Sequence, residues 1–192
     1  MDDDARLLGA ALWRADWLDA REYAEAAAAP GGERLTGVVL LPIGGRPGRI
    51  GYRVETGPDG TTRSASVEIS SGGEPWRLEL RADGAGGWIR DGLPAPELTG
   101  CADVDLGFSP VTNTLPIRRL SGAAEGEEHP VAAAWLRYPE LVVERLDQTY
   151  TRLGPETWRY RAPSLAFEAL LATDPVGLVR RYGELWGRVD GS

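Results

Sequence analysis

Two aspartates and two arginines are the residues of this sequence whose spacing best supports chemistry. Asp103 and Asp105 alternate, so on a strand both carboxylates project from one face. Hard cations such as Ca²⁺ bind carboxylates in this way but recruit several further oxygen ligands, and no full set is visible, so we expect pairing with arginine and no metal. Arg118 and Arg119 follow. On an extended chain only one of them points inward, where its planar fork suits a carboxylate or a phosphate.

Two roles are open for the inward arginine. If Asp103 or Asp105 holds it, the arginine is a strut, and we expect one buried ion pair between one of these arginines and one of these aspartates. If neither aspartate holds it, the inward arginine is the best candidate for binding an anionic or hydroxyl-rich ligand. The aspartates and Glu79 could also act as the acid and base of a hydrolase, although nothing selects them among 29 acidic residues.

Other reactive side chains are scarce. Cys101 is the only cysteine, which excludes an intrachain disulfide and a multi-cysteine metal site. His129 is the only histidine, and it is expected in a solvated acidic loop beside Pro130 without a catalytic partner. All 21 basic residues are arginine, so lysine Schiff-base chemistry is excluded. We expect no cofactor and no catalytic residue.

Charge and length narrow the class of protein. The 192 residues carry a net charge of −8 and a pI near 4.8. Nucleic-acid-binding domains usually show a basic stripe and a high pI, so no nucleic-acid partner is expected. The longest apolar runs are a handful of residues, too short for stable membrane insertion. The acidic N-terminal segment favours a cytoplasmic protein over one with a secretory signal. The length favours a single domain, 1–192.

The spacing of turn-forming residues along the chain is typical of a turn-rich all-β protein. From Leu35 onward, clusters of glycine and proline separate runs of strand length. Apolar and charged residues alternate most cleanly in Trp76–Ala82, which places one face on a core and the other in water. Similar alternation occurs at 52–55 and 65–69. Less regular runs of strand length lie at 132–138, 158–162, 165–172 and 178–186.

Three segments are harder to assign. Residues 5–29 are rich in alanine, and propensity alone would favour a helix. Residues 141–148 fit a helix or a strand. In the run 112–120, Pro116 removes a backbone donor and pushes Leu115 toward extended geometry. This run is therefore expected at a sheet edge, bulge or bend, as a fixed corner that aims an arginine at the aspartates.

The run 98–120, LTGCADVDLGFSPVTNTLPIRRL, resembles the signature of the bacterial glycolipid-binding family, with a GCxDVDL block followed by TNTLPIRRL. The resemblance implies a fold similar to that of the periplasmic lipoprotein-localisation factors, a long antiparallel sheet rolled into a spiral around an apolar cavity. We therefore expect an all-β spiral β-roll or open barrel with at most short helices, and strands around Trp13 and at 22–28. Weaker matches extend over almost the whole chain and are Trp13, Arg14, Trp88, Asp91, Gly92, Pro139, Leu141, Gln148, Tyr150, Asp174, Gly177, Leu178, Val179 and Tyr182.

The same resemblance implies a non-enzymatic binding or carrier protein for a glycolipid or another amphiphilic small molecule. One departure is visible, because the family's aromatic-rich strand is replaced by TTRSAS at 61–66. The alternatives are a hydrolase acting on a lipid or sugar ester, and a structural or interaction protein with a filled barrel and no ligand. The expected ligand contacts are Asn113, Arg118 and Arg119 at a polar head group, with Trp13, Trp88 and Tyr150 as aromatic contacts.

Overall fold

The computed structural model describes residues 5–189, whose strands form one fifteen-stranded sheet. The order is β8-β7-β6-β5-β4-β3-β2-β1-β15-β14-β13-β12-β11-β10-β9, so the all-β expectation is confirmed. The strands are β1 (Arg6–Ala15), β2 (Ala20–Ala29), β3 (Gly32–Ile43), β4 (Arg46–Thr56), β5 (Thr62–Ser70), β6 (Trp76–Ala82), β7 (Trp88–Arg90), β8 (Leu93–Pro94), β9 (Asp103–Leu106), β10 (Glu128–Arg137), β11 (Val142–Gly154), β12 (Thr157–Ala162), β13 (Phe167–Thr173), β14 (Val179–Tyr182) and β15 (Trp186–Arg188). The helical pieces are α1 (Thr114–Arg119) and the short 3₁₀ turns η1 (Asp16–Leu18), η2 (Pro96–Leu98), η3 (Val111–Asn113) and η4 (Pro163–Leu165).

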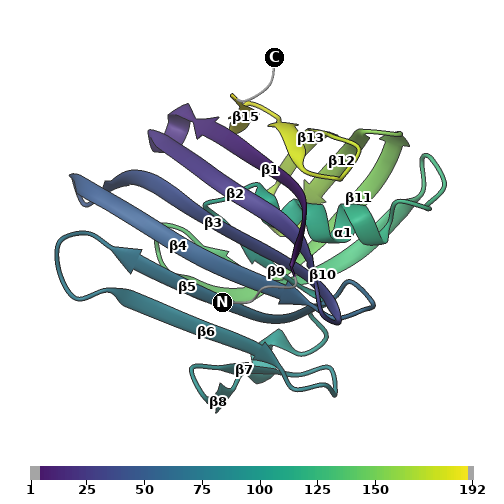
Figure 1. The fold of residues 1–192 in the computed structure, drawn as a ribbon. Coiled ribbons are helices and arrows are strands. Elements are labelled where there is room, and N and C mark those ends of the chain that lie inside the picture. The colour runs from purple at the N-terminus through teal and green to yellow at the C-terminus, as the bar shows by residue number, and fades with distance from the viewer. Residues whose placement is uncertain (1–4, 190–192) are drawn as a thin grey trace.

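Strands β1–β6 form the first arm of the sheet, an antiparallel meander (Figure 1). Leu78 and Leu80 of β6 are buried while Arg77 is exposed, as the alternation predicts. In alanine-rich β2, every second residue from Ala20 to Ala26 is buried. This packing outweighs a helix preference of only tenths of a kcal/mol per residue. The strands expected around Trp13 and at 22–28 are thus confirmed as β1 and β2.

Strands β10–β15 form the second arm, and β15 pairs with β1 so that the two ends of the described chain meet in mid-sheet. Residues 142–148 belong to β11, which resolves the ambiguity there in favour of a strand. The run 178–186 contains two strands, because the chain turns at Gly183 between β14 and β15. His129 lies in β10 opposite Tyr150, so its placement in a loop was wrong.

The run 112–120 is a helical crossover and not an extended corner. η3 and α1 connect β9 to β10, which pair in parallel, and parallel neighbours need a crossover because the chain must return to the same end of the sheet. Leu115 is helical, so its expected extended geometry was wrong. Pro116 is tolerated in the first helical turn, where the backbone N–H has no helical partner to lose.

Helix α1 lies inside the curve of the sheet (Figure 1). Leu115 packs in the larger buried cluster, which joins the first arm to β9 and parts of the second arm, whereas Ile117 packs in a cluster of the second arm alone. The curved sheet is called the roll below. Its two arms are joined near β5 and β9, where the backbone N–H of Thr62 donates to Ala102 O (2.9 Å) and that of Val104 donates to Thr62 Oγ1 (3.1 Å). No helix within residues 5–189 is long and apolar enough to cross a membrane.

Candidate functional site

Arg119 and Asp103 form an ion pair between α1 and β9. The guanidinium donates from Nη1 to Oδ1 over 2.9 Å and from Nη2 to Oδ2 over 2.6 Å, and Nη1 also donates to Gly60 O. Only 3% of the Asp103 side chain is exposed. Burial raises the pKa of Asp103 above its usual value, while Arg119 acts in the opposite direction. Arg119 is therefore the arginine that has the structural role, joining α1 to β9.

Arg118 points elsewhere, because successive residues of a helix are turned by about 100°. Its Nε donates to Val176 O over 2.6 Å, and its Nη1 forms a short ion pair with Glu33. The two neighbouring arginines therefore have different partners. One joins β9, and the other borders a hollow at the surface.

That hollow, the Arg118 groove, has a volume of about 390 Å³ and lies between α1 and the turns at one end of the roll. Apolar side chains supply much of its wall, and Trp158 and Ile117 are almost wholly buried behind it. Sequence reasoning found Arg118 but missed most of its neighbours. The lining residues are Leu8, Glu33, Ile117, Arg118, Ser121, Pro155, Trp158, Thr173, Asp174, Pro175, Val176 and Gly177.

The charged groups of the groove are compensated within the protein. Glu33 pairs with Arg118, and Asp174 pairs with Arg188 at 2.7 Å. Asp174 Oδ1 also accepts the backbone N–H groups of Val176 (3.1 Å) and Leu178 (2.9 Å), which fixes the turn that forms one wall. The groove therefore combines apolar walls with polar groups and no uncompensated charge.

A second hollow, the Asp105 pocket, has a volume of about 170 Å³ and lies near the turns η1 and η4. The carboxylate of Asp105 accepts hydrogen bonds from Gln148 Nε2 and, at 3.5 Å, from the hydroxyl of Thr112. Burial raises the pKa of Asp105 to about 6. The lining residues are Trp17, Asp105, Leu106, Gly107, Ser109, Trp135, Leu146, Tyr160, Leu165, Phe167, Tyr182, Leu185 and Trp186.

Sequence reasoning singled out Asp105 but not the aromatic side chains around it. The signal was available in β12, where Trp158 and Tyr160 alternate with Arg159 and Arg161 and so face inward. Tyr160 meets residues of η1 and β14 in the Asp105 pocket, whereas Trp158 lies behind the Arg118 groove. Both placements depend on the rolled sheet, which the local pattern does not reveal.

The remaining expected ligand contacts are hydrogen-bonded inside the protein. Tyr150 donates to Asn113 Oδ1 over 2.8 Å, and Asn113 Nδ2 donates to Pro110 O over 3.2 Å. The indole of Trp13 donates to Val179 O over 2.6 Å. Trp88 donates to Cys101 O over 3.1 Å and borders a separate surface hollow, whose Asp59 and Thr61 flank the Gly60 carbonyl that Arg119 binds. The structure thus does not gather the six residues around one opening.

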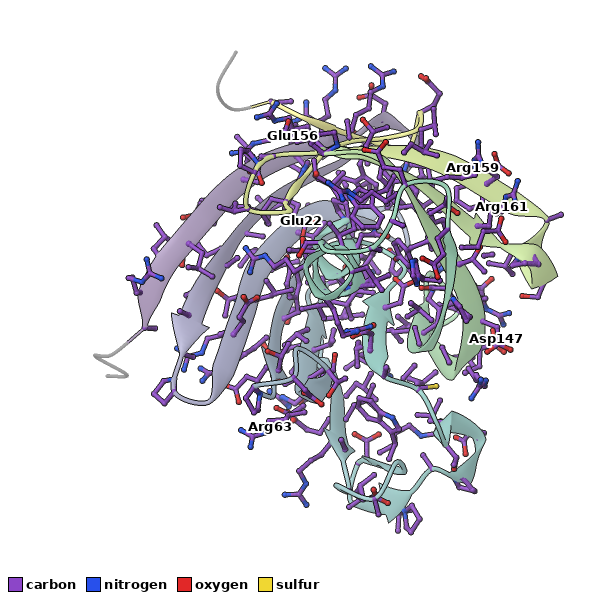
Figure 2. The ribbon with its side chains drawn as sticks, turned by 90° about the vertical axis from the view of Figure 1, so that its right-hand side faces the viewer. Glu22, Arg63, Asp147, Glu156, Arg159 and Arg161 are labelled. Atoms are coloured by element: carbon purple, nitrogen blue, oxygen red, sulfur yellow. The ribbon has the colours of Figure 1, made fainter. Side chains whose placement is uncertain are left out.

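A buried carboxyl group was missed altogether. Glu22 lies on the inner face of β2, inside the roll, whereas Arg159 and Arg161 project from its outside (Figure 2). Its Oε1 accepts hydrogen bonds from Tyr52 and, at 2.5 Å, from Ser109. Burial raises the pKa of Glu22 to about 8, so the neutral acid predominates at pH 7. Nothing in the local sequence distinguishes this residue from a surface glutamate.

Comparisons with known proteins agree with this architecture. The chain is similar to a DUF1089 family protein from Pseudomonas aeruginosa whose crystal structure is known. The two sequences are 32% identical, and the structures superpose with a TM-score of 0.77 over 88% of this chain and 92% of that one. No curated protein sequence matches the chain significantly. One protein-family model matches residues 10–188. Because that match spans nearly all of the described residues, this chain belongs to the family described as "Putative glycolipid-binding".

Proposed function

We propose that this protein binds a glycolipid or a similar amphiphile without chemically changing it, and that the Arg118 groove holds the ligand. The Arg118 groove is the observation that carries this proposal. Its volume of about 390 Å³ lies within the range of small-molecule sites, which typically combine apolar walls with a few placed polar groups. The description of the family supports the same class of ligand.

The composition of the groove indicates how an amphiphile would lie in it. Leu8, Pro175 and Val176 offer apolar surface to an acyl chain or to the hydrophobic face of a sugar ring. Ser121 offers an exposed hydroxyl group at the edge, whereas Thr173 is buried behind it. Because the charges of the groove are already compensated, an uncharged, hydroxyl-rich head group fits better than an anionic one.

The other expected contacts take supporting roles in this proposal. Tyr150 and Asn113 brace the segment that leads into α1, and Arg119 fastens its end to β9. Trp13 holds β14 through its indole N–H. These residues would position Arg118 without touching the ligand.

The hydrolase alternative has less support from the arrangement of its candidate acids. Asp103 is held by Arg119, and Asp105 lines a different hollow from Glu79, which lies on the outer face of β6. A glycosidase-type reaction needs two carboxyl groups that flank one bond. Nothing in the described residues brings Glu79 to the aspartates.

Binding is tested by native mass spectrometry of protein purified without detergent and by titration with octyl glucoside below its micelle concentration. We expect a co-purifying lipid or saturable binding of octyl glucoside. Ser121 is exposed at the edge of the groove, so Ser121→Trp should obstruct it without disturbing the core and weaken binding at least tenfold.

Ser164→Trp is the matched control, because Ser164 is exposed on η4, away from the groove. Its affinity should equal that of the unmodified protein. Absence of both a co-purifying lipid and octyl glucoside binding would contradict the proposal, as would equal binding by the Ser121→Trp variant.

A further inference from the structure

The Asp105 pocket contains a carboxylate that no basic side chain neutralises. Among residues 5–189, Asp105 has hydrogen bonds from Gln148 and Thr112 but no arginine or histidine within ion-pair distance. Asp103, two residues earlier on the same strand, is engaged at both oxygens by Arg119. Buried carboxylates in proteins are usually paired, so the absence of a cation at Asp105 distinguishes it from its neighbour.

The walls of this pocket are aromatic. The rings come from η1, β10, β12, β13, β14 and β15 and belong to Trp17, Trp135, Tyr160, Phe167, Tyr182 and Trp186. Tyr160 packs edge-on against Phe167 (5.9 Å between centroids) and against Tyr182 (5.8 Å), so these three rings form one contiguous wall. Aromatic rings attract organic cations through the negative potential of their faces.

The pocket is reachable and small. Trp17 is 50% exposed and Leu165 is 46% exposed, so these two side chains form its rim. Its volume of about 170 Å³ is less than half that of the Arg118 groove, about 390 Å³, which suits a compact head group better than a long chain.

An inorganic cation fits this pocket poorly. Ca²⁺ and Mg²⁺ need six or more oxygen ligands, and transition metals prefer several histidine, cysteine or carboxylate side chains. The described residues contain no group of three or more such side chains. A single carboxylate beside aromatic rings is instead the combination that recognises an organic ammonium group.

We propose that the Asp105 pocket binds an organic ammonium group, such as a methylated amine, through the carboxylate of Asp105 and the surrounding aromatic rings. The site is distinct from the Arg118 groove and does not depend on a ligand being bound there. It adds an amine-binding activity to this fold.

The ionisation of Asp105 should control this binding. The titratable groups near its carboxylate are Asp103 on β9, Tyr150 on β11, Tyr160 on β12 and Tyr182 on β14. Arg119 compensates Asp103, and burial raises the pKa of all three tyrosines, which therefore stay neutral at physiological pH. Asp105 is thus the group that changes charge near pH 6, and affinity for a cation should fall as the pH is lowered from 7 to 5.

The test uses choline as the probe and its uncharged isostere 3,3-dimethyl-1-butanol as the matched ligand, followed by tryptophan fluorescence and calorimetry of the full chain. We expect choline to bind at least tenfold more tightly than the alcohol at pH 7.5. Asp105→Asn should remove that preference, while Asp147→Asn, on the outer face of β11, should keep it.

A second variant covers the case in which Asp105→Asn does not fold. Trp17→Ala removes a half-exposed rim residue and should weaken choline binding at least threefold without unfolding the protein. Methyl glucoside at the same concentrations tests a sugar as the occupant. The proposal is overturned by equal affinity for choline and its alcohol isostere, by methyl glucoside binding without choline binding, or by no binding of choline to the folded protein.

Discussion

Arg119, the last residue of α1, is joined to Asp103, the first residue of β9, by two hydrogen bonds of 2.9 and 2.6 Å. Removal of either partner leaves the other charge buried without compensation. We expect Asp103→Asn and Arg119→Ala each to lower the free energy of unfolding by roughly 3 to 5 kcal/mol. Chemical denaturation of each variant, and of the double variant, measures this loss and the coupling between the two residues.

The control for the ion pair is Arg161, which forms exposed pairs with Glu128 and Glu168 on the outside of the roll. Arg161→Ala should cost less than about 1 kcal/mol because such pairs are screened by solvent. If Arg119→Ala left stability unchanged but abolished ligand binding, the strut role would be wrong and Arg119 would belong to a binding site.

A second prediction concerns Glu22, whose pKa is raised by burial from near 4.5 to about 8. Between these values the folded protein holds a proton that the unfolded chain has released, so stability should fall as the pH rises. At about 1.4 kcal/mol per pH unit, the loss reaches roughly 4 to 5 kcal/mol by pH 8. Denaturation between pH 6.5 and pH 8.5, above the range in which Asp105 changes charge, should show this slope in the unmodified protein.

Glu22→Gln should flatten that slope, because glutamine resembles the neutral acid in shape and cannot ionise. Glu25→Gln, on the opposite face of the same strand, provides the comparison and should keep the slope of the unmodified protein. An unchanged slope in the Glu22→Gln variant would show that another group is responsible.

The third prediction concerns the contact between Gly37 and Tyr52. The Tyr52 hydroxyl reaches Glu22 across β3, and a Cβ added at Gly37 would lie 2.1 Å from that oxygen. Gly37→Ala must therefore displace a buried ring, and we expect a loss of about 2 to 3 kcal/mol. Gly51→Ala on β4 should cost much less, because its Cβ would meet only the flexible end of Arg49 at 3.2 Å. Thermal unfolding of both variants compares the two sites, and equal losses would contradict this reading.

The strands were predictable where burial follows a simple alternation. Leu78 and Leu80 show it within a few residues, and the sheet confirms it. The helix α1 was not predictable from its own residues, because Pro116 is normally read as a break and only its position in the first turn makes it acceptable. The strand β2 required the family resemblance, since alanine-rich sequence alone favours a helix.

The site was predictable only in its chemistry. Complementary charge indicated that an arginine near 118 would pair with an aspartate near 103, but the choice of Arg119 and Asp103 depends on helical spacing that was not foreseen. The burial of Glu22 could not be predicted, because Tyr52 and Ser109 approach it from 30 and 87 residues away. Contacts of this range are set by the rolling of the sheet.

The final prediction concerns Cys101, which lies beside the place where the two arms of the roll are joined. Burial raises the pKa of this thiol to about 11, so at pH 8 only about 0.1% of it is thiolate, against roughly a quarter for a free cysteine. Alkylation by iodoacetamide should therefore be at least 100-fold slower in the folded protein than in guanidinium chloride. A folded-state rate equal to the unfolded rate would contradict the buried placement.

Thr62 should control access to that thiol. Its Oγ1 accepts the backbone N–H of Val104, and its own N–H donates to the carbonyl of Ala102, the residue that follows Cys101. Thr62→Val keeps the side-chain shape but leaves the Val104 N–H unpaired, which costs about 1 to 3 kcal/mol. The lost hydrogen bond lies where β5 joins β9, directly after Cys101. Local opening there should therefore become more frequent, and labelling of Cys101 should become several-fold faster. Thr61→Val, whose hydroxyl bonds only the exposed Asp59, should leave the rate unchanged. Equal rates in the two variants would mean that the roll opens elsewhere.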